Sequence, residues 1–339
     1  MRLNESKFCM TIRNSNSIIV PMKKLVFAVL LTTSFVMLAV WQRHFLLFEL
    51  PGSSAPPPLL DVVEESGSSY WYDDYFLVDQ IDSQTFAIGE PRYYQQNFSY
   101  LILGTESAIL FDAGPGLRDI RPVTNSLTDL PITFIPSHFH YDHIGNTITF
   151  ENVAVIDLPY LRRRAESNSL KLTWAEHLGS SEGIAAPTLE IDEWLPINSS
   201  LDLGERVLQV LYTPGHTEDS VSLLDTKSGM IFSGDFIYPG ALYAFLPTSN
   251  MGDYLVGAET LLENAKFDAE LYGAHRSSAP GLPLLATEDV RDLRAALIAI
   301  KNRELEGSGM FPRMYKVNER LDILAEPSWL QNWVPDSKD

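Results

Sequence analysis

Three histidines and an aspartate fall within six consecutive positions, and this spacing constrains the fold more than any other feature of the chain. They are His138, His140, Asp142 and His143, and they follow the apolar run 132–135. In extended backbone alternate side chains share one side, so the first two histidines project together, and a turn after them returns the other two residues to that side. Imidazole and carboxylate without a nearby thiolate suit zinc, manganese or iron rather than a closed structural zinc site. The cluster therefore predicts two metal half-sites that lie close together.

The composition limits which fold size, partners and covalent links the chain can have. Only 7 of the 339 residues are histidine, which disfavours the alternative of a chance histidine-rich surface turn. A chain of this length with 45% hydrophobic residues can bury one full catalytic core with appendages. The net charge is −19, and an acidic body repels phosphate backbones, so we expect no nucleic-acid partner. The single thiol, Cys9, can form no intramolecular disulfide.

The N-terminus carries an apolar run over residues 25–41, preceded by Lys23 and Lys24. We expect a transmembrane anchor there, with residues 1–24 as a basic cytoplasmic N-terminus and an exported catalytic body. Two alternatives remain. One is a cleaved signal that starts at Met22 and leaves a secreted or periplasmic protein, and the other is a buried core helix.

Three further segments follow. Residues 42–69 contain a proline-rich stretch and are predicted to be a linker, residues 70–306 the catalytic domain and residues 307–339 a C-terminal extension. The extension either covers the domain or contacts a partner. The aromatic stretch 70–76 is predicted to be an edge strand or helix packed on the core, with an interfacial belt or a cleft lip as alternatives. Residues 287–305 have the spacing of an amphipathic helix.

Short apolar runs in the body predict strands that end in polar loops. Residues 100–103 and 108–111 read as a hairpin, and Asp112 follows the second strand. Asp112 is either an ordinary turn cap or a carboxylate that orients a metal-binding loop from behind. His216, Asp235 and His275 also follow predicted strands, where binding groups collect when a rigid sheet holds loops.

Two other features have mainly structural interpretations. Residues 162–164 are three consecutive arginines, which we interpret as a solvated helix face, with an anion clamp for a phosphorylated substrate as the alternative. His177 lies in a polar insert without other candidate ligands nearby, so we expect a structural or surface role.

Five motifs, taken in order, resemble those of the metallo-β-lactamase-fold hydrolases. They are the Asp112 turn, the His-x-His-x-Asp-His cluster, the Pro-Gly-His loop at His216, the Gly-Asp turn at Asp235 and the final His275. The resemblance implies an α+β fold, a four-layer αββα sandwich with a dinuclear site at one edge of the sheets. It also implies the ligand set: one metal on His138, His140 and His216, a second on Asp142, His143 and His275, and Asp235 bridging both. Two Zn²⁺ ions per chain are expected, with iron or manganese as alternatives.

The resemblance also implies a chemistry. Two metal ions lower the pKa of a shared water so that hydroxide attacks a carbonyl at neutral pH. Asp142 and Asp235 are the expected catalytic carboxylates, with proton acceptance by Asp142 as a hypothesis. The run 232–242 is similar to the acyl-CoA thioesterase-like branch, and the expected substrate is a small thioester, ester or lactone. Export would oppose coenzyme A as that substrate.

Alternatives to this function stay open. Dedicated β-lactamases of this fold have Cys or Ser at the position of Asp235, so a β-lactamase is the second choice. An iron-dependent persulfide oxygenase and a binding module without catalysis are the others. Tyr238, Tyr243 and Phe245 either line an apolar entrance or pack beneath it, and Arg276, next to the last histidine, is a weaker candidate for substrate binding.

Overall fold

The computed structural model of this chain describes residues 22–49, 55–65 and 67–336. The chain divides into two units, Met1–Leu47 and Phe48–Asp339. Residues 1–21, which make up most of the predicted cytoplasmic N-terminus, and part of the predicted linker lie outside the described residues.

The described part of the first unit contains helix α1 (Met22–Trp41), followed at the boundary between the units by a π-helical turn (Phe45–Glu49). The helix has 20 residues and includes Lys23 and the hydroxyl residues Thr32 and Thr33. Within the described ranges, no helix combines the length and the apolar character that a membrane span requires. The anchor predicted for residues 25–41 is therefore not supported, and export stays a prediction.

The second unit contains a mixed sheet of eight strands in the order β1-β2-β3-β4-β5-β6-β7-β10. The strands are β1 (Ser69–Trp71), β2 (Leu77–Asp82), β3 (Thr85–Glu90), β4 (Asn97–Leu103), β5 (Ala108–Phe111), β6 (Ile132–Ile135), β7 (Asn152–Ile156) and β10 (Glu193–Leu195). Strands β1 to β5 pair antiparallel, whereas β5, β6 and β7 run parallel. Parallel neighbours end at the same edge of a sheet. The loops after β5 and β6, which carry Asp112 and the histidine cluster, therefore emerge side by side.

A second sheet has six strands in the order β11-β12-β13-β14-β16-β17. They are β11 (Ser200–Asp202), β12 (Val207–Tyr212), β13 (Val221–Asp225), β14 (Ile231–Gly234), β16 (Glu270–Gly273) and β17 (Leu284–Ala286). Strand β13 pairs antiparallel with both β12 and β14, and β14 pairs parallel with β16. Strands β12, β14 and β16 thus point the same way, and the loops with His216, Asp235 and His275 follow their carboxyl ends.

Alternating side chains of the six-stranded sheet face two different cores. Val210, Phe232 and Tyr272 belong to the core between the two sheets. Their neighbours Leu211, Ile231 and Leu271 belong to a second core with the helices behind the sheet. This alternation is the period of two that a strand buried on both faces requires. The Tyr100 hydroxyl ties the sheets together at the site edge by donating to the Gly273 carbonyl at 2.5 Å.

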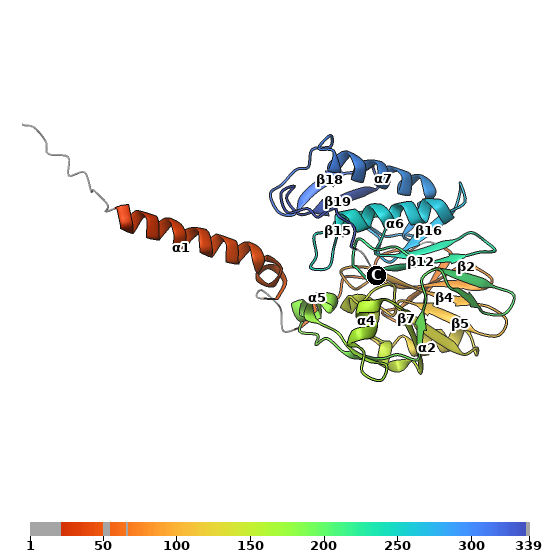
Figure 1. The fold of residues 1–339 in the computed structure, drawn as a ribbon. Helices are drawn as coiled ribbons and strands as arrows, with labels where there is room; N and C mark the ends of the chain where they lie inside the picture. Colours follow the sequence, from red (N-terminus) through yellow and green to blue (C-terminus); the bar gives the residue numbers. More distant parts are fainter. Residues whose placement is uncertain (1–21, 50–54, 66, 337–339) are drawn as a thin grey trace, which may run out of the picture. The chain divides into compact units, whose positions relative to one another are not determined.

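Helices complete the layers on both outer faces. Helices α6 (Met251–Asn264) and α7 (Thr287–Lys301) cover the six-stranded sheet, and α2 (Arg121–Leu127) and α4 (Pro159–Arg164) lie on the outer side of the eight-stranded sheet (Figure 1). Asn250 caps α6 by accepting hydrogen bonds from the amides of Gly252 and Asp253. The α+β class is confirmed, as is a helix within residues 287–305.

Smaller elements fill the connections. Strands β15 (Gly240–Ala244), β19 (Leu321–Ala325) and β18 (Arg313–Lys316) form a three-stranded sheet, and β8 (Ser169–Lys171) pairs with β9 (Thr188–Glu190). The short helices are α3 (Tyr141–Ile144), α5 (Trp174–His177) and two 3₁₀ turns, Thr147–Thr149 and Gly179–Glu182. The C-terminal residues thus pair with the body through β15, and the Gly252 amide at the start of α6 donates to the Asn332 carbonyl. Of the predicted edge strand at 70–76, only the first two residues form a strand, as part of β1, which pairs with β2 at the edge of the sheet.

Candidate metal centre

The histidine cluster changes direction within a few residues, as its spacing requires. Residues 136–140 leave β6 in a loop, and the backbone of His140 is extended, with φ −62° and ψ 147°. Helix α3 begins at the next residue and turns the chain back. All four cluster side chains are buried, with exposed fractions of 1–4%. Local backbone geometry alone therefore brings the four ligand candidates to one side.

Three imidazoles form the first group of ligand atoms. Nδ1 of His140 lies 2.8 Å from Nε2 of His138 and 3.1 Å from Nε2 of His216. His216 arrives from the second sheet, 76 residues after His140. These nitrogens face one another rather than a common protein partner, as the ligands of a shared ion would.

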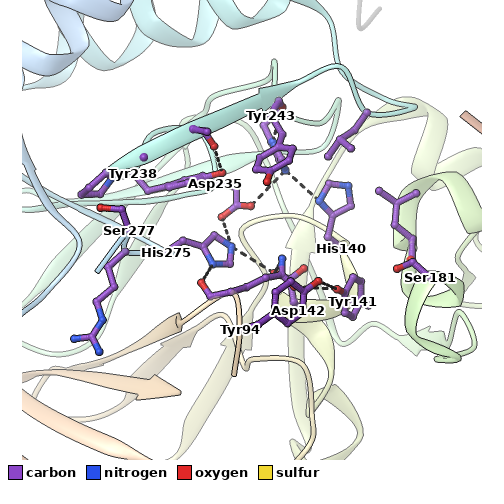
Figure 2. A pocket seen from close by; sticks show the side chains of 18 of the residues that line it. Tyr94, His140, Tyr141, Asp142, Ser181, Asp235, Tyr238, Tyr243, His275 and Ser277 are labelled. Carbon is purple, nitrogen blue, oxygen red and sulfur yellow. Dashed lines mark hydrogen bonds and ion pairs between the residues drawn. The ribbon is translucent and has the colours of Figure 1, made fainter. Parts of the chain in front are cut away.

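The second group combines one carboxylate and two imidazoles. Oδ2 of Asp142 lies 3.4 Å from Nε2 of His143 and 3.4 Å from Nε2 of His275. Asp235 lies between the two groups. Its Oδ1 is 3.0 Å from Nε2 of His275, and its Oδ2 is 3.5 Å from Nε2 of His216. In Figure 2 the Asp235 carboxylate points toward the space between the imidazoles of His140 and His275.

The donor set fits metal ions. Within each group the ligand atoms lie within 4.8 Å of one another, and every residue of both groups is buried. Nε2 of His143 and Oδ1 of Asp235 are buried without a hydrogen-bond partner in the described structure. A buried polar atom without a partner carries a desolvation penalty, which coordination to a cation would remove. The structure thus brings together all seven residues predicted as ligands.

The outer ring nitrogens of four histidines have fixed partners. In each case the atom is Nδ1, and the contact distance is 2.9–3.0 Å. The partners are the Ser137 hydroxyl for His138, the Asp112 carboxylate for His143, the Tyr243 carbonyl for His216 and the Gln95 carbonyl for His275. Such partners fix the tautomer and orient the ring toward a metal. Asp112 also accepts a hydrogen bond from the Ser137 amide at 2.6 Å, and its φ of 64° is left-handed. Asp112 therefore occupies the position that its predicted role in orienting the metal-binding loop requires.

The histidines of the two groups have pKa values shifted in opposite directions. Burial lowers the pKa of His138, His140 and His216, and nearby imidazoles add to this effect. Burial also opposes the charged forms of His143 and His275, but the neighbouring carboxylates outweigh it. They raise the pKa of His143 well above its usual range and that of His275 to about 10. Ions that enter the second group therefore displace protons.

A cavity of about 370 Å³ opens onto both groups (Figure 2). Its lining includes His140, Asp142, His216, Asp235 and His275. The other walls are largely aromatic and aliphatic, and they include Tyr94, Leu178, Tyr238, Tyr243 and Leu246. A cavity of this size with apolar walls and a polar floor is typical of a small-molecule site.

The candidate substrate residues divide into three cases. Tyr238 and Tyr243 line the cavity, and the Tyr238 hydroxyl donates to the Ala241 carbonyl at 2.7 Å. Phe245 packs beneath Tyr243, with ring centroids 5.6 Å apart. Arg276 also borders the cavity, but both carboxylate oxygens of Glu65 bind its guanidinium. This pairing argues against a role for Arg276 in substrate binding.

Two of the three arginines have structural partners, and His177 is buried. Arg162 pairs with Asp157 and lies over the Trp194 ring, and Arg164 pairs with Glu176. The helix-face interpretation is therefore favoured over an anion clamp. His177 is 2% exposed, and burial lowers its pKa to about 4, which agrees with a structural role.

The sequence analysis missed two polar residues that contact the site. The side-chain amides of Gln95 and Asn97 donate to Oδ2 of Asp142 at 3.0 and 3.1 Å. Gln95 lies 47 residues before Asp142 in the sequence, and Asn97 lies 45 residues before it. Their chain segment has no motif, so only the fold relates it to the centre.

Comparisons with known proteins show which family the chain is similar to. Residues 92–302 match the model of the metallo-beta-lactamase superfamily. The chain is 28% identical over 210 residues to acyl-coenzyme A thioesterase MBLAC2 of Gallus gallus, which covers 56% of this chain and 76% of that protein. It is 29% identical over 200 residues to hydroxyacylglutathione hydrolase of Bradyrhizobium sp. (strain ORS 278), covering 57% and 68%. The solved metallo-beta-lactamase from Pontibacter korlensis aligns with a TM-score of 0.48 and 16% identity, covering 66% of this chain and 99% of that one.

Proposed function

Because this chain belongs to the metallo-β-lactamase superfamily, we propose that it is a hydrolase of carboxylic thioesters, with esters and lactones as related substrates. The family and the buried His/Asp groups make it a metallo-β-lactamase-fold hydrolase. The thioester bond and the apolar acyl group are the new parts of the proposal.

The centre is proposed to hold two zinc ions, with iron or manganese as alternatives. His138, His140 and His216 would hold one, Asp142, His143 and His275 the other, and Asp235 offers one oxygen to each group. Zinc in such surroundings lowers the pKa of bound water to about 7 and polarises a carbonyl oxygen.

Asp142 is proposed to accept the proton of the attacking hydroxide when the carbon–sulfur bond breaks and the thiolate departs. Burial opposes its charge, but the imidazoles of His143 and His275 outweigh burial and hold its pKa well below the usual range. The carboxylate therefore begins the reaction ionised, with no proton of its own. It borders the cavity, where a leaving group would lie.

The single observation that carries the substrate class is the lining of the cavity. Apolar side chains such as Leu178 and Leu246 form walls beside the ligand atoms. Arg276 is the only lysine or arginine among the described lining residues, and Glu65 already binds its guanidinium. Penicillins and cephalosporins carry a carboxylate beside the lactam ring, which would lack a cationic partner here. A neutral, apolar acyl group fits these walls better.

The names of the similar proteins support the thioester. Acyl-coenzyme A and hydroxyacylglutathione are both thioesters, and they appear in the names of the two relatives given above. Two objections to coenzyme A stand beside this support: export of the domain, which stays a prediction, and the acidic net charge of −19, which disfavours a polyanion. Acyl-coenzyme A and acyl glutathione are therefore tested side by side as thiol carriers.

The test is a substrate panel with the full chain, loaded with zinc after chelator treatment. The panel comprises a short and a long acyl-coenzyme A, an acyl glutathione, an acyl lactone and nitrocefin. We expect the highest kcat/KM for a thioester and loss of that activity when chelator removes the metal. Efficient turnover of nitrocefin alone would reverse the assignment. One iron per purified chain, with oxygen consumption on a persulfide, would instead indicate an oxygenase.

A further inference from the structure

We propose that residues 95–97 act as a brace that positions one half of the metal centre, the half formed by Asp142, His143 and His275. The inference rests on the proposed metal centre and assigns positioning roles to Gln95 and Asn97. It identifies how the fold holds the carboxylate ligand of that half.

The brace lies where the two sheets meet. Asn97 is the first residue of β4 and forms an isolated bridge with His275 beyond the end of β16. The next amide, of Phe98, donates to the Ala274 carbonyl at 2.8 Å. Gln96 has a φ of 50°, which turns the backbone sharply before the strand. Residues 95–97 are therefore fixed to the strand that delivers His275.

Two amide side chains of the brace hold the Asp142 carboxylate. Gln95 Nε2 and Asn97 Nδ2 donate to the same oxygen, Oδ2, at 3.0 and 3.1 Å. Asn97 Nδ2 also reaches the Asp142 carbonyl at 2.8 Å, so it fixes the backbone together with the side chain. This oxygen is the ligand atom that faces both imidazoles of the half-site. The amides thus fix the direction of the carboxylate ligand.

The backbone of the brace holds a second ligand. The carbonyl of Gln95 lies 2.9 Å from Nδ1 of His275. A carbonyl accepts only, so it selects the tautomer that carries the proton on Nδ1 and leaves Nε2 free for a metal. One residue therefore orients two of the three ligands.

The orientation of the Gln95 amide is itself fixed. The Asp142 carboxylate only accepts, so it requires the Nε2 donor on its side and leaves Oε1 2.9 Å from the Tyr141 hydroxyl. The same hydroxyl lies 2.6 Å from Glu182, a buried residue of the 3₁₀ turn Gly179–Glu182. Ser181 of that turn lines the cavity. The brace thus joins the cavity wall to the metal ligands.

The three-histidine half has different supports. His138 contacts the Ser137 hydroxyl, and His216 contacts the Tyr243 carbonyl. Neither partner belongs to residues 95–97. Loss of the brace should therefore weaken one of the two ions selectively, which a general loss of stability would not do.

The test is zinc binding to the chelator-stripped full chain, followed by competition with a chromophoric chelator and by calorimetry. Gln95→Met keeps the length of the side chain and removes its donor, and Asn97→Ala removes the second donor. Removal of such supporting hydrogen bonds lowers metal affinity by about 10- to 100-fold. We expect that loss for one of two ions, with the other unchanged. Gln80→Met, the same change at an exposed position of β2, is the matched control and should bind as the unmodified chain does.

Cobalt gives a second readout. The visible spectrum of the two-cobalt protein reports ligand geometry, and Gln95→Met should change the bands of one ion only. Far-ultraviolet circular dichroism of the metal-free variants checks that they fold, and Tyr141→Phe replaces Asn97→Ala if the latter does not. Equal weakening of both ions, or of neither, would overturn the brace. An unmodified chain that binds fewer than two zinc ions would contradict the proposed centre itself.

Discussion

Glu65 binds the guanidinium of Arg276 with both carboxylate oxygens, at 2.6 and 2.8 Å, and the two side chains are only 4% and 2% exposed. Arg276 directly follows the proposed ligand His275, and it also donates to Gln96 at 2.9 Å. This pair therefore fastens the segment before the first sheet to the edge of the metal centre. The pair also explains why the Arg276 guanidinium, although it borders the cavity, is not available to bind substrate.

Removal of Glu65 should strongly destabilise the protein. Glu65→Ala leaves a buried guanidinium without its charge partner, and breaking a buried ion pair costs about 3–5 kcal/mol. Urea unfolding of the zinc-loaded chain, followed by circular dichroism, measures the loss. The double variant Glu65→Leu with Arg276→Met removes both charges, so it should unfold at a higher urea concentration than Glu65→Ala. A single variant as stable as the unmodified chain would show that the pair contributes little.

Asp112 should matter for metal affinity through His143. Asp112→Asn tolerates the left-handed backbone, but its amide can no longer serve as a carboxylate acceptor for both the Ser137 amide and His143 Nδ1. We expect zinc affinity to fall by about 10- to 100-fold, as measured by competition with a chelator. Asp268→Asn, at an exposed position, is the matched control. Unchanged affinity in Asp112→Asn would leave Asp112 as a turn residue only.

Glu90 should make the metal-free protein less stable as the pH rises. Burial raises the pKa of Glu90 to about 8, above its ordinary value of 4.5. Between these values the folded chain keeps a proton that the unfolded chain has lost, so the free energy of unfolding falls with increasing pH. Gln at this position still accepts from the Tyr75 hydroxyl.

Glu90→Gln should therefore nearly match the unmodified chain at pH 5 and exceed it at pH 9, by up to about 4 kcal/mol for a pKa raised from 4.5 to about 8. Urea unfolding at the two pH values, with chelator present, measures the difference. Parallel pH profiles for the two proteins would show that Glu90 is ionised in the fold without penalty.

The positions of the ligands could be predicted because strand ends are a local feature. His216, Asp235 and His275 follow short apolar runs and so mark strand ends in the sequence, but their roles as ligands were implied by the resemblance of their motifs to the family. The four-residue cluster needs only the alternation of extended backbone and one turn of helix. Residues 287–305 likewise carry their own helical periodicity.

The supports of the centre could not be predicted because their partners are distant in the sequence. Arg276 and Glu65 are 211 residues apart, and Gln95 and His275 are 180 apart. Sequence spacing placed Arg276 beside the last histidine, which suggested a substrate role, but it could not show the carboxylate that binds it. The apolar run 25–41 was interpreted from its hydropathy and the basic residues before it, and the structure does not support a membrane span there.

Tyr243 should select for longer acyl chains. Its side chain is 40% exposed at the cavity, and its ring packs on Phe245, which in turn packs on Phe311. Only its backbone carbonyl contacts His216, so Tyr243→Ala removes apolar wall without removing that hydrogen bond. Loss of a buried contact with a chain of several methylenes should raise KM for a long acyl thioester by about 10-fold, with a smaller effect on a short one.

Steady-state kinetics on acetyl and dodecanoyl thioesters separates the two ways in which Tyr243 can act. Tyr243→Phe keeps the ring and should behave as the unmodified chain, and Tyr70→Ala, at another exposed tyrosine on β1, is the matched control. An equal fall in kcat for both substrates would mean that the change disturbs His216 rather than the wall. The acyl chain would then have to occupy a different part of the cavity.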